Sequence, residues 1–145
     1  MSSVRISAIM FFLMMSAIAR AELLVEKGYV RASVPGTDST SAYMTLINTG
    51  DKDVVLTAVT SPAAAKVSIH MSMNHEGMMH MMGMESLKIE AHKSVLLESG
   101  GTHLMLENPP VPLAVGSKIE FVLQFADGQK KQIVLPVQSV LVDKH

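Results

Sequence analysis

The 145-residue sequence contains no cysteine and no tryptophan, and its other aromatic residues amount to four phenylalanines and two tyrosines. Without a thiol the chain forms no disulfide and performs no thiol chemistry, so its folding does not depend on the redox state of its compartment. Lysine and arginine number 12 against 13 for aspartate and glutamate, and they form no basic cluster. This balance argues against nucleic acid as a partner, because nucleic-acid-binding domains carry basic patches.

Long apolar runs are missing except near the N-terminus. The run from Ile6 to Ile18 follows Arg5 and precedes the small-x-small triplet of residues 19–21. It is shorter than the roughly 20 residues that span a bilayer, so we interpret residues 1–21 as a cleaved signal peptide rather than a membrane anchor. Without a cysteine there is no lipidation site at the junction. We therefore expect a periplasmic protein with no stable membrane insertion.

Residues 22–145 show no helical periodicity and no sign of a second domain. Apolar residues recur at every second position in short runs between turn residues, which is typical of an all-β domain. The clearest hairpin joins alternating residues from Ile119 to Phe125 with those from Ile133 to Val137 across the turn at 126–129. Eight or nine such strands predict a two-sheet β-sandwich of Greek-key type, with a closed barrel as the alternative.

Methionine is the residue type in clear excess. The sequence contains 13 methionines, and seven of them lie between Met71 and Met84. A thioether is a soft, neutral donor without a titrating proton, so it prefers monovalent copper to the harder cations that carboxylates attract. Imidazole adds a further donor without adding charge. Histidine and methionine close together therefore indicate a site for reduced copper.

Four of these residues have a spacing that suggests one metal site. Ten residues separate His70 from Met81, 21 separate Met81 from His103, and one separates His103 from Met105. Two imidazoles and two thioethers form a donor set for Cu(I), and we predict these four residues as the ligands. Blue-copper electron carriers need a cysteine thiolate in addition, so we expect a site that binds copper without being tuned for electron transfer.

The expected strand around His103 supports this assignment. His103 and Met105 are two positions apart, so they project to the same face with about 6.5 to 7 Å between their Cα atoms. Leu104 and Leu106 then face the core and hold the strand in register. The preceding Gly100 and its neighbour allow the chain to turn into this strand.

A hairpin is expected to bring the other two ligands together. We predict strands over residues 65–71 and 79–84, with His70 at the end of the first and Met81 near the start of the second. Met71 points to the opposite face of an extended strand and would need a bulge to join the same ion. It therefore ranks below the four predicted ligands.

The remaining histidines and methionines have other expected roles. The expected hairpin tip at 76–77 is flanked by residues that could form an exposed soft lip for capturing or passing on copper: Met73, His75, Met78 and His80. For Met79, Met82 and Met84 we favour packing or docking over coordination, because methionine fills irregular gaps and adapts to varied partners. His92 is expected to be a solvated strand-end residue rather than a ligand.

These residues resemble the periplasmic copper chaperones of the PCuAC family, whose signature is His, ten residues, Met, 21 residues and His-x-Met. Further segments that look like the family in the same order are YVRASVPG (29–36), SAYMTL (41–46), NTG (48–50), SPAA (61–64) and GGTHLML (100–106). The resemblance implies a cupredoxin-like sandwich. It also implies a carrier of Cu(I) toward the dinuclear copper centre of cytochrome c oxidase, alongside Sco-type thiol proteins.

Three functions remain open at this point. The first is a copper(I) chaperone that releases its ion by ligand exchange, the second a periplasmic copper buffer that gives copper tolerance, and the third a Met-rich protein-interaction module in which metal is incidental. An enzyme is not expected, because no nucleophile is paired with a base and the acidic residues are scattered.

Overall fold

The computed structural model describes residues 23–139, and this part of the chain is all-β, as predicted. The expected signal peptide, residues 1–21, lies outside the described residues. Ten strands occur within the described range instead of the eight or nine expected: β1 (Leu23–Arg31), β2 (Ser39–Asn48), β3 (Val54–Thr60), β4 (Lys66–His75), β5 (Met78–Met84), β6 (Leu87–Ile89), β7 (Ser94–Leu97), β8 (Thr102–Glu107), β9 (Lys118–Phe125) and β10 (Lys130–Gln138). In this range we find no helix able to cross a bilayer.

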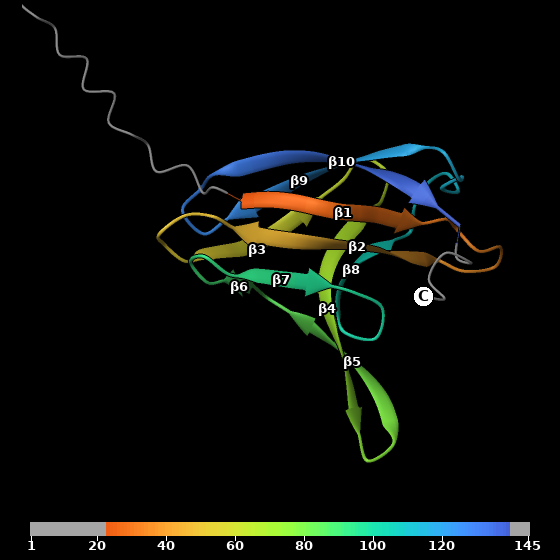
Figure 1. Cartoon of the computed structure of the whole chain (residues 1–145). Coiled ribbons are helices and arrows are strands. Elements are labelled where there is room, and N and C mark those ends of the chain that lie inside the picture. The colour runs from red at the N-terminus through yellow and green to blue at the C-terminus, as the bar shows by residue number, and fades with distance from the viewer. Residues whose placement is uncertain (1–22, 140–145) are drawn as a thin grey trace, which may run out of the picture.

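The strands form one hydrogen-bonded sheet that closes on itself (Figure 1). The order is β5-β4-β8-β2-β1-β10-β9-β3-β6, and β7 pairs with β2. The circuit closes where Val59 of β3 pairs with Val67 of β4. The expected sandwich or barrel architecture is therefore present, and the strand order gives it a barrel-like closure. Closure pairs the backbone groups that two open sheets would leave at their edges.

The barrel interior is filled by the alternating residues that the sequence pattern predicts. On β9, Ile119, Phe121, Leu123 and Phe125 are all buried, and Phe121 is fully excluded from solvent. The inward-facing residues of β10, such as Leu135, complete the layer. Because side chains alternate along a strand, the intervening residues of β9 are exposed or half-buried. The core thus supports β8, which lies between β4 and β2.

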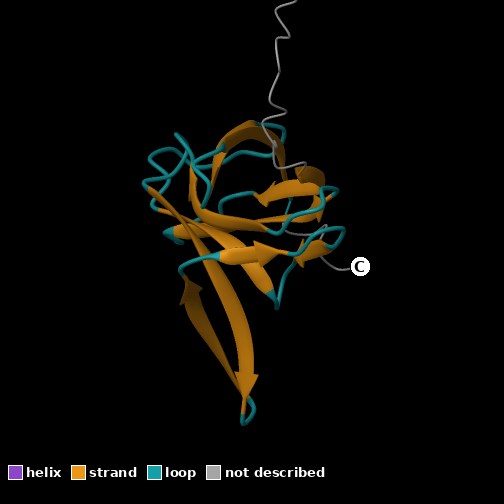
Figure 2. Cartoon of the chain, turned by 90° about the vertical axis from the view of Figure 1, so that its left-hand side faces the viewer, coloured by secondary structure: helices purple, strands orange, loops and turns teal. Residues whose placement is uncertain are grey.

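The β4–β5 hairpin projects away from the barrel (Figures 1 and 2). Its two-residue turn consists of Glu76 and Gly77, both with positive φ (53° and 81°), as a type I′ turn requires. This turn matches the twist of the strands, so pairing continues without a gap to His75 and Met78. The strands are therefore longer than predicted, and His70 lies in the middle of β4 rather than at its end.

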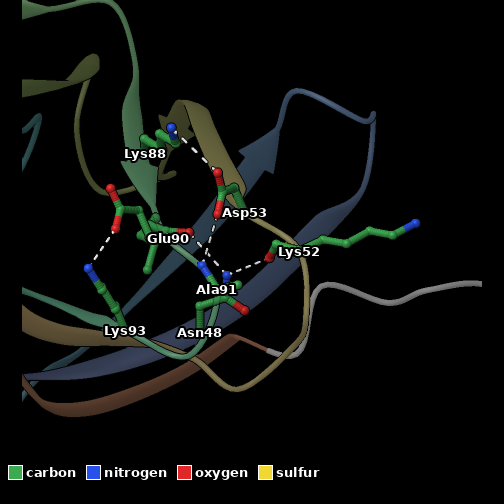
Figure 3. Close-up of polar contacts among 8 residues, drawn as sticks. Asn48, Lys52, Asp53, Lys88, Glu90, Ala91 and Lys93 are labelled. Carbon is green, nitrogen blue, oxygen red and sulfur yellow. Dashed lines mark hydrogen bonds and ion pairs between the residues drawn. The ribbon is translucent and has the colours of Figure 1, made fainter.

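A buried asparagine ties together the loops at the end of β2 (Figure 3). Asn48 is 1% exposed, and its Nδ2 donates to the carbonyl oxygens of Lys52 (2.7 Å) and Ile89 (3.0 Å). Its Oδ1 accepts a hydrogen bond from the Gly50 N–H at 3.0 Å. A buried polar side chain is tolerated when its hydrogen bonds are made within the protein. Asn48 therefore joins the β2–β3 connection to β6.

An exposed charged group extends this contact. The Ala91 N–H donates to Asp53 Oδ1 at 3.0 Å, and this bond lowers the pKa of Asp53 below its ordinary value, assisted by Lys88 at 3.4 Å. Since the folded-state pKa lies below the unfolded-state value, the carboxylate stabilises the fold at neutral pH, and this contribution is lost as the pH falls through the folded-state pKa. Lys93 and Glu90 form a neighbouring ion pair at 2.9 Å.

Substituting Asn48 with alanine is expected to lower the free energy of unfolding by about 2–3 kcal/mol, because the buried Ile89 carbonyl and the part-buried Lys52 carbonyl lose their donor. Urea unfolding followed by circular dichroism measures the change. Asn74→Ala is the matched control, since Asn74 is an exposed residue of the hairpin and its substitution should change stability by less than about 0.5 kcal/mol. Equal stability of the two variants would contradict the role given to Asn48.

Candidate metal centre

The strand register places the four predicted ligands on one face of three adjacent strands. His70 of β4 pairs directly with His103 of β8. On the other side of β4, Met81 of β5 pairs with Ser72. Paired residues project to the same side, and so do residues two apart on a strand. His70, His103, Met105 and Met81 therefore share a face.

The two histidine rings form the middle of this group. Their centroids are 6.2 Å apart and their planes are inclined by 23°. His103 is only 4% exposed, and its ring also lies 6.4 Å from that of Tyr43 on β2. Tyr29 of β1 packs against Tyr43 at 5.3 Å. The barrel thus holds the imidazole of His103 between an aromatic wall and His70.

Each imidazole has one nitrogen held by the protein. His103 Nδ1 is 3.0 Å from the Gly101 carbonyl, which can only accept, so Nδ1 carries the proton and Nε2 keeps its lone pair. His70 Nε2 is 2.8 Å from Ser68 Oγ, while its buried Nδ1 has no hydrogen-bond partner within the described residues. When Nε2 donates to the serine, Nδ1 carries the lone pair. An orphaned buried nitrogen costs about 1–3 kcal/mol unless a ligand occupies it, and one anchored and one free nitrogen is the pattern of metal-binding histidine.

Met105 lies beside the histidine pair on the central strand β8. It pairs with Ser68 of β4 on one side and with Ser41 of β2 on the other, so its direct partners on both adjacent strands are small, and Met105 itself is half-buried. The alternate residues Leu104 and Leu106 are fully buried in the core, as predicted. A strand anchored on its other face by two leucines gives Met105 a defined position.

Met81 is the outlying member of the four. It lies on the edge strand β5, opposite Ser72, which is two residues beyond His70 toward the hairpin tip. It is 57% exposed. Gly83 stands directly opposite His70 on β5, and no atom lies within 4 Å of where its Cβ would be. Because this glycine has no side chain, the space next to His70 on the β5 side is open. The structure therefore brings His70, His103 and Met105 together, whereas Met81 must swing across that space to join them.

The lower-ranked methionines lie on both faces of the hairpin, and the remaining histidine lies elsewhere. The β4–β5 register runs from Ile69 to His75 without a shift, so Met71 points away from His70. Met84 packs against the core, whereas Met79 and Met82 are 63% and 55% exposed and do not fill it. His92 is exposed and contacts Asp51 at 2.8 Å.

The chemistry of the centre depends on sulfur. Among the described residues, no group of three or more histidine, aspartate and glutamate side chains could hold a metal ion. The donors next to the histidine pair are thioethers, and two imidazole nitrogens with neutral sulfur suit a soft monovalent ion. Sequence reasoning missed Ser68 and Tyr43, although Ser68 is two residues before His70 and so had to share its face. The role of the Gly101 carbonyl had no sequence signal.

A glycine turn sets the position of His103. Gly101 N–H donates to the Glu98 carbonyl at 3.1 Å, and Gly100 between them has a φ of 82°, which a side chain makes costly. The Gly101 carbonyl then accepts from both His103 Nδ1 and the Ser72 N–H of β4, at 3.0 and 3.2 Å. This single carbonyl therefore orients the ring and ties β4 to the start of β8.

Gly100→Ala is expected to destabilise the fold by about 1 kcal/mol or more, because alanine is strained at this φ. It should also expose the His103 Nδ1–H to faster solvent exchange, measured by nitrogen-15 NMR of the imidazoles. Gly36→Ala is the matched control, since Gly36 has a similar φ of 84° and equally open surroundings but lies in another loop. Unchanged exchange at His103 in Gly100→Ala would refute the orienting role.

Comparisons with known proteins agree with this fold. The family described as "Putative lipoprotein LpqE-like" matches residues 23–137. A Leifsonia xyli protein named "Putative lipoprotein Lxx21020" is 32% identical over 116 residues, which cover 79% of this chain and 69% of that protein. The uncharacterized protein RP573 of Rickettsia prowazekii is 31% identical over 109 residues, covering 74% of this chain and 60% of its own length.

Solved structures of similar fold include copper-binding domains. The Cu(I) form of DR1885 from Deinococcus radiodurans is 30% identical, with a TM-score of 0.66 and 85% of each chain covered. The copper-bound PCuAC domain from PmoF2 has a TM-score of 0.68 at 21% identity, covering 81% of this chain and 92% of that domain, and so shows the fold alone. The resemblance to the PCuAC family stated from the sequence is confirmed.

Proposed function

The chain belongs to the LpqE-like family, and on that premise we propose that it is a periplasmic copper(I) chaperone. Copper is its cargo, bound by His70, His103, Met105 and Met81. The observation that carries the proposal is the histidine pair, in which each ring has one anchored nitrogen and one free nitrogen beside the thioether of Met105. The likeness to the Cu(I) form of DR1885, at 30% identity over 85% of the chain, supports the choice of ion.

The position of the four side chains suggests how the ion is released. His103 and Met105 belong to a strand packed on the core, whereas Met81 belongs to the exposed edge of a projecting hairpin (Figure 2). Loss of the Met81 thioether therefore disturbs the fold least. A partner's thiolate binds Cu(I) more strongly than a thioether, so it displaces Met81 first and draws the ion from the hairpin side. The site exchanges ligands and performs no catalysis.

Delivery toward the dinuclear copper centre of cytochrome c oxidase, with Sco-type thiol proteins as partners, is part of the proposal. So are the signal peptide at 1–21, a single domain over 22–145, the Greek-key connectivity and the periplasmic location. The matching family and the Leifsonia xyli relative carry the word lipoprotein in their names. Because these 145 residues contain no cysteine for lipid attachment, we propose a protein that is free in the periplasm.

X-ray absorption at the copper edge tests the site. The protein loaded anaerobically with one equivalent of Cu(I) is expected to show a monovalent ion with mixed nitrogen and sulfur donors. A shell of nitrogen and oxygen alone would rule out the proposed ligands. Anaerobic titration against a competing chelator separates a copper protein from an interaction module in which metal is incidental.

A periplasmic copper buffer is the second candidate, supported by the excess of methionine on the hairpin. A deletion strain distinguishes the two functions. Loss of oxidase activity at low copper, restored by added copper, supports delivery. Sensitivity to high copper without an oxidase defect supports buffering.

A further inference from the structure

The face of the β4–β5 hairpin opposite the metal centre carries a second group of soft donors. Met73 pairs with His80, and His75 pairs with Met78, and these are the two pairs of that face nearest the turn. Ser72 and Met81, which pair with each other, lie on the metal-centre face. Each of the four residues is an odd number of positions from Ser72 or Met81 on its own strand, so its side chain projects from the other face of the hairpin. We call these four residues the reverse-face cluster.

We propose that the reverse-face cluster binds a second Cu(I) ion, separate from the one at the histidine pair. This inference rests on the proposed copper function. The cluster has two thioethers and two imidazoles, the same donor set as the principal site. Residues paired across an antiparallel ladder have Cβ atoms about 5 Å apart, and rows on one face are about 7 Å apart. Long, unbranched methionine side chains bridge these separations to a common ion.

The exposure of the cluster argues against a packing role. Met73 and Met78 are 44% and 64% exposed, and both histidines are exposed as well. Burying apolar surface is what makes methionine useful in a core, and these methionines gain only part of that stabilisation. Valine, isoleucine or threonine would support an exposed strand better, so strand formation does not explain the composition either.

The composition of the hairpin favours a metal over a protein partner. Every apolar residue from Met71 to Met84 is methionine, apart from the two glycines, and the segment has no aromatic residue, leucine or isoleucine. Protein interfaces draw much of their affinity from large aromatic anchors. The segment also has no lysine or arginine, so no fixed positive charge repels a monovalent cation. Soft, neutral donors without cations suit Cu(I).

Anaerobic titration with Cu(I) against a competing chelator tests the stoichiometry. The wild-type protein is expected to take up two equivalents. A variant that keeps side-chain bulk and polarity, Met73→Leu with Met78→Leu, His75→Gln and His80→Gln, should take up one. Met79→Leu is the matched control, because Met79 is next to Met78 and equally exposed but lies on the other face. It should retain two equivalents.

The methyl groups of Met73 and Met78 give a second readout in the unaltered protein. Their carbon-13 NMR signals should shift during the second equivalent of Cu(I), and they should also shift in a His103→Ala, Met105→Ala variant, which lacks the principal site. Unshifted methyl signals, or two equivalents in the fourfold variant, would overturn the proposal. Unchanged tight binding in the His103→Ala, Met105→Ala variant would instead overturn the principal site, so the two failures are distinguishable.

Discussion

His103→Ala is expected to weaken Cu(I) binding at the principal site by more than about 100-fold. Loss of a group that merely orients a metal ligand typically costs 10- to 100-fold in affinity, and His103 is itself a proposed ligand. Its ring lies in the middle of the site, 6.2 Å from the ring of His70. Met105 is two residues further along the same strand. Without His103, the imidazole of His70 and the thioether of Met105 lose the donor that lies beside both of them.

Anaerobic competition against a chromophoric Cu(I) chelator measures this loss. His92→Ala is the matched control. His92 is exposed, and its described side-chain hydrogen bond is to Asp51 on the surface. It should bind copper as the wild-type protein does. Because His103 is buried, circular dichroism must show that the variant is folded at the temperature of the titration. Unaltered affinity in a folded His103→Ala protein, or in the double variant with Met105→Ala, would show that the site lies elsewhere.

Leu104→Ala is expected to lower the free energy of unfolding by about 2–5 kcal/mol, the usual cost of emptying a buried leucine site. Leu104 is fully buried and stands between His103 and Met105 on β8. Its removal should also weaken Cu(I) binding, because the strand that presents both ligands loses its anchor in the core. Urea unfolding gives the first effect, and chelator competition gives the second.

Leu97→Ala separates the loss of stability from the effect on the site. Leu97 is 1% exposed and belongs to β7, which does not carry a proposed ligand. Both variants should lose similar stability, while Leu97→Ala keeps its copper affinity. If the two variants lose affinity equally, the effect reflects global destabilisation, and the proposed support of the site by Leu104 is wrong.

The sequence predicts which face of a strand each residue occupies, because the alternation of side chains depends only on local backbone geometry. Alternation placed Leu104 and Leu106 in the core, and the hairpin from Ile119 to Val137 packs as the pattern indicates. The turn at 76–77 was recognisable from a glycine between two runs of similar residues. The ends of β4 were not, because histidine, asparagine and methionine have no strong strand preference and only pairing with β5 extends the strand to His75.

The candidate ligands were found from donor chemistry and spacing, without a structure. Their relative importance was not. Spacing treats Met81 and Met105 alike, yet the structure places Met105 on a supported strand and Met81 on an exposed edge. The anchoring of the two imidazoles by Gly101 and Ser68 was likewise invisible, because a backbone carbonyl has no sequence signature.

The sequence by itself determined the all-β class and the face on which each residue lies within its own strand, and it supplied the candidate donor set. The tertiary structure alone decided that β4 and β8 are neighbours with His70 opposite His103, that the sheet closes at Val59 and Val67, and that the hairpin carries soft donors on both faces. The physical reason is the range of the forces involved. Alternation follows from local backbone geometry, whereas register between distant strands is set by how the whole core packs.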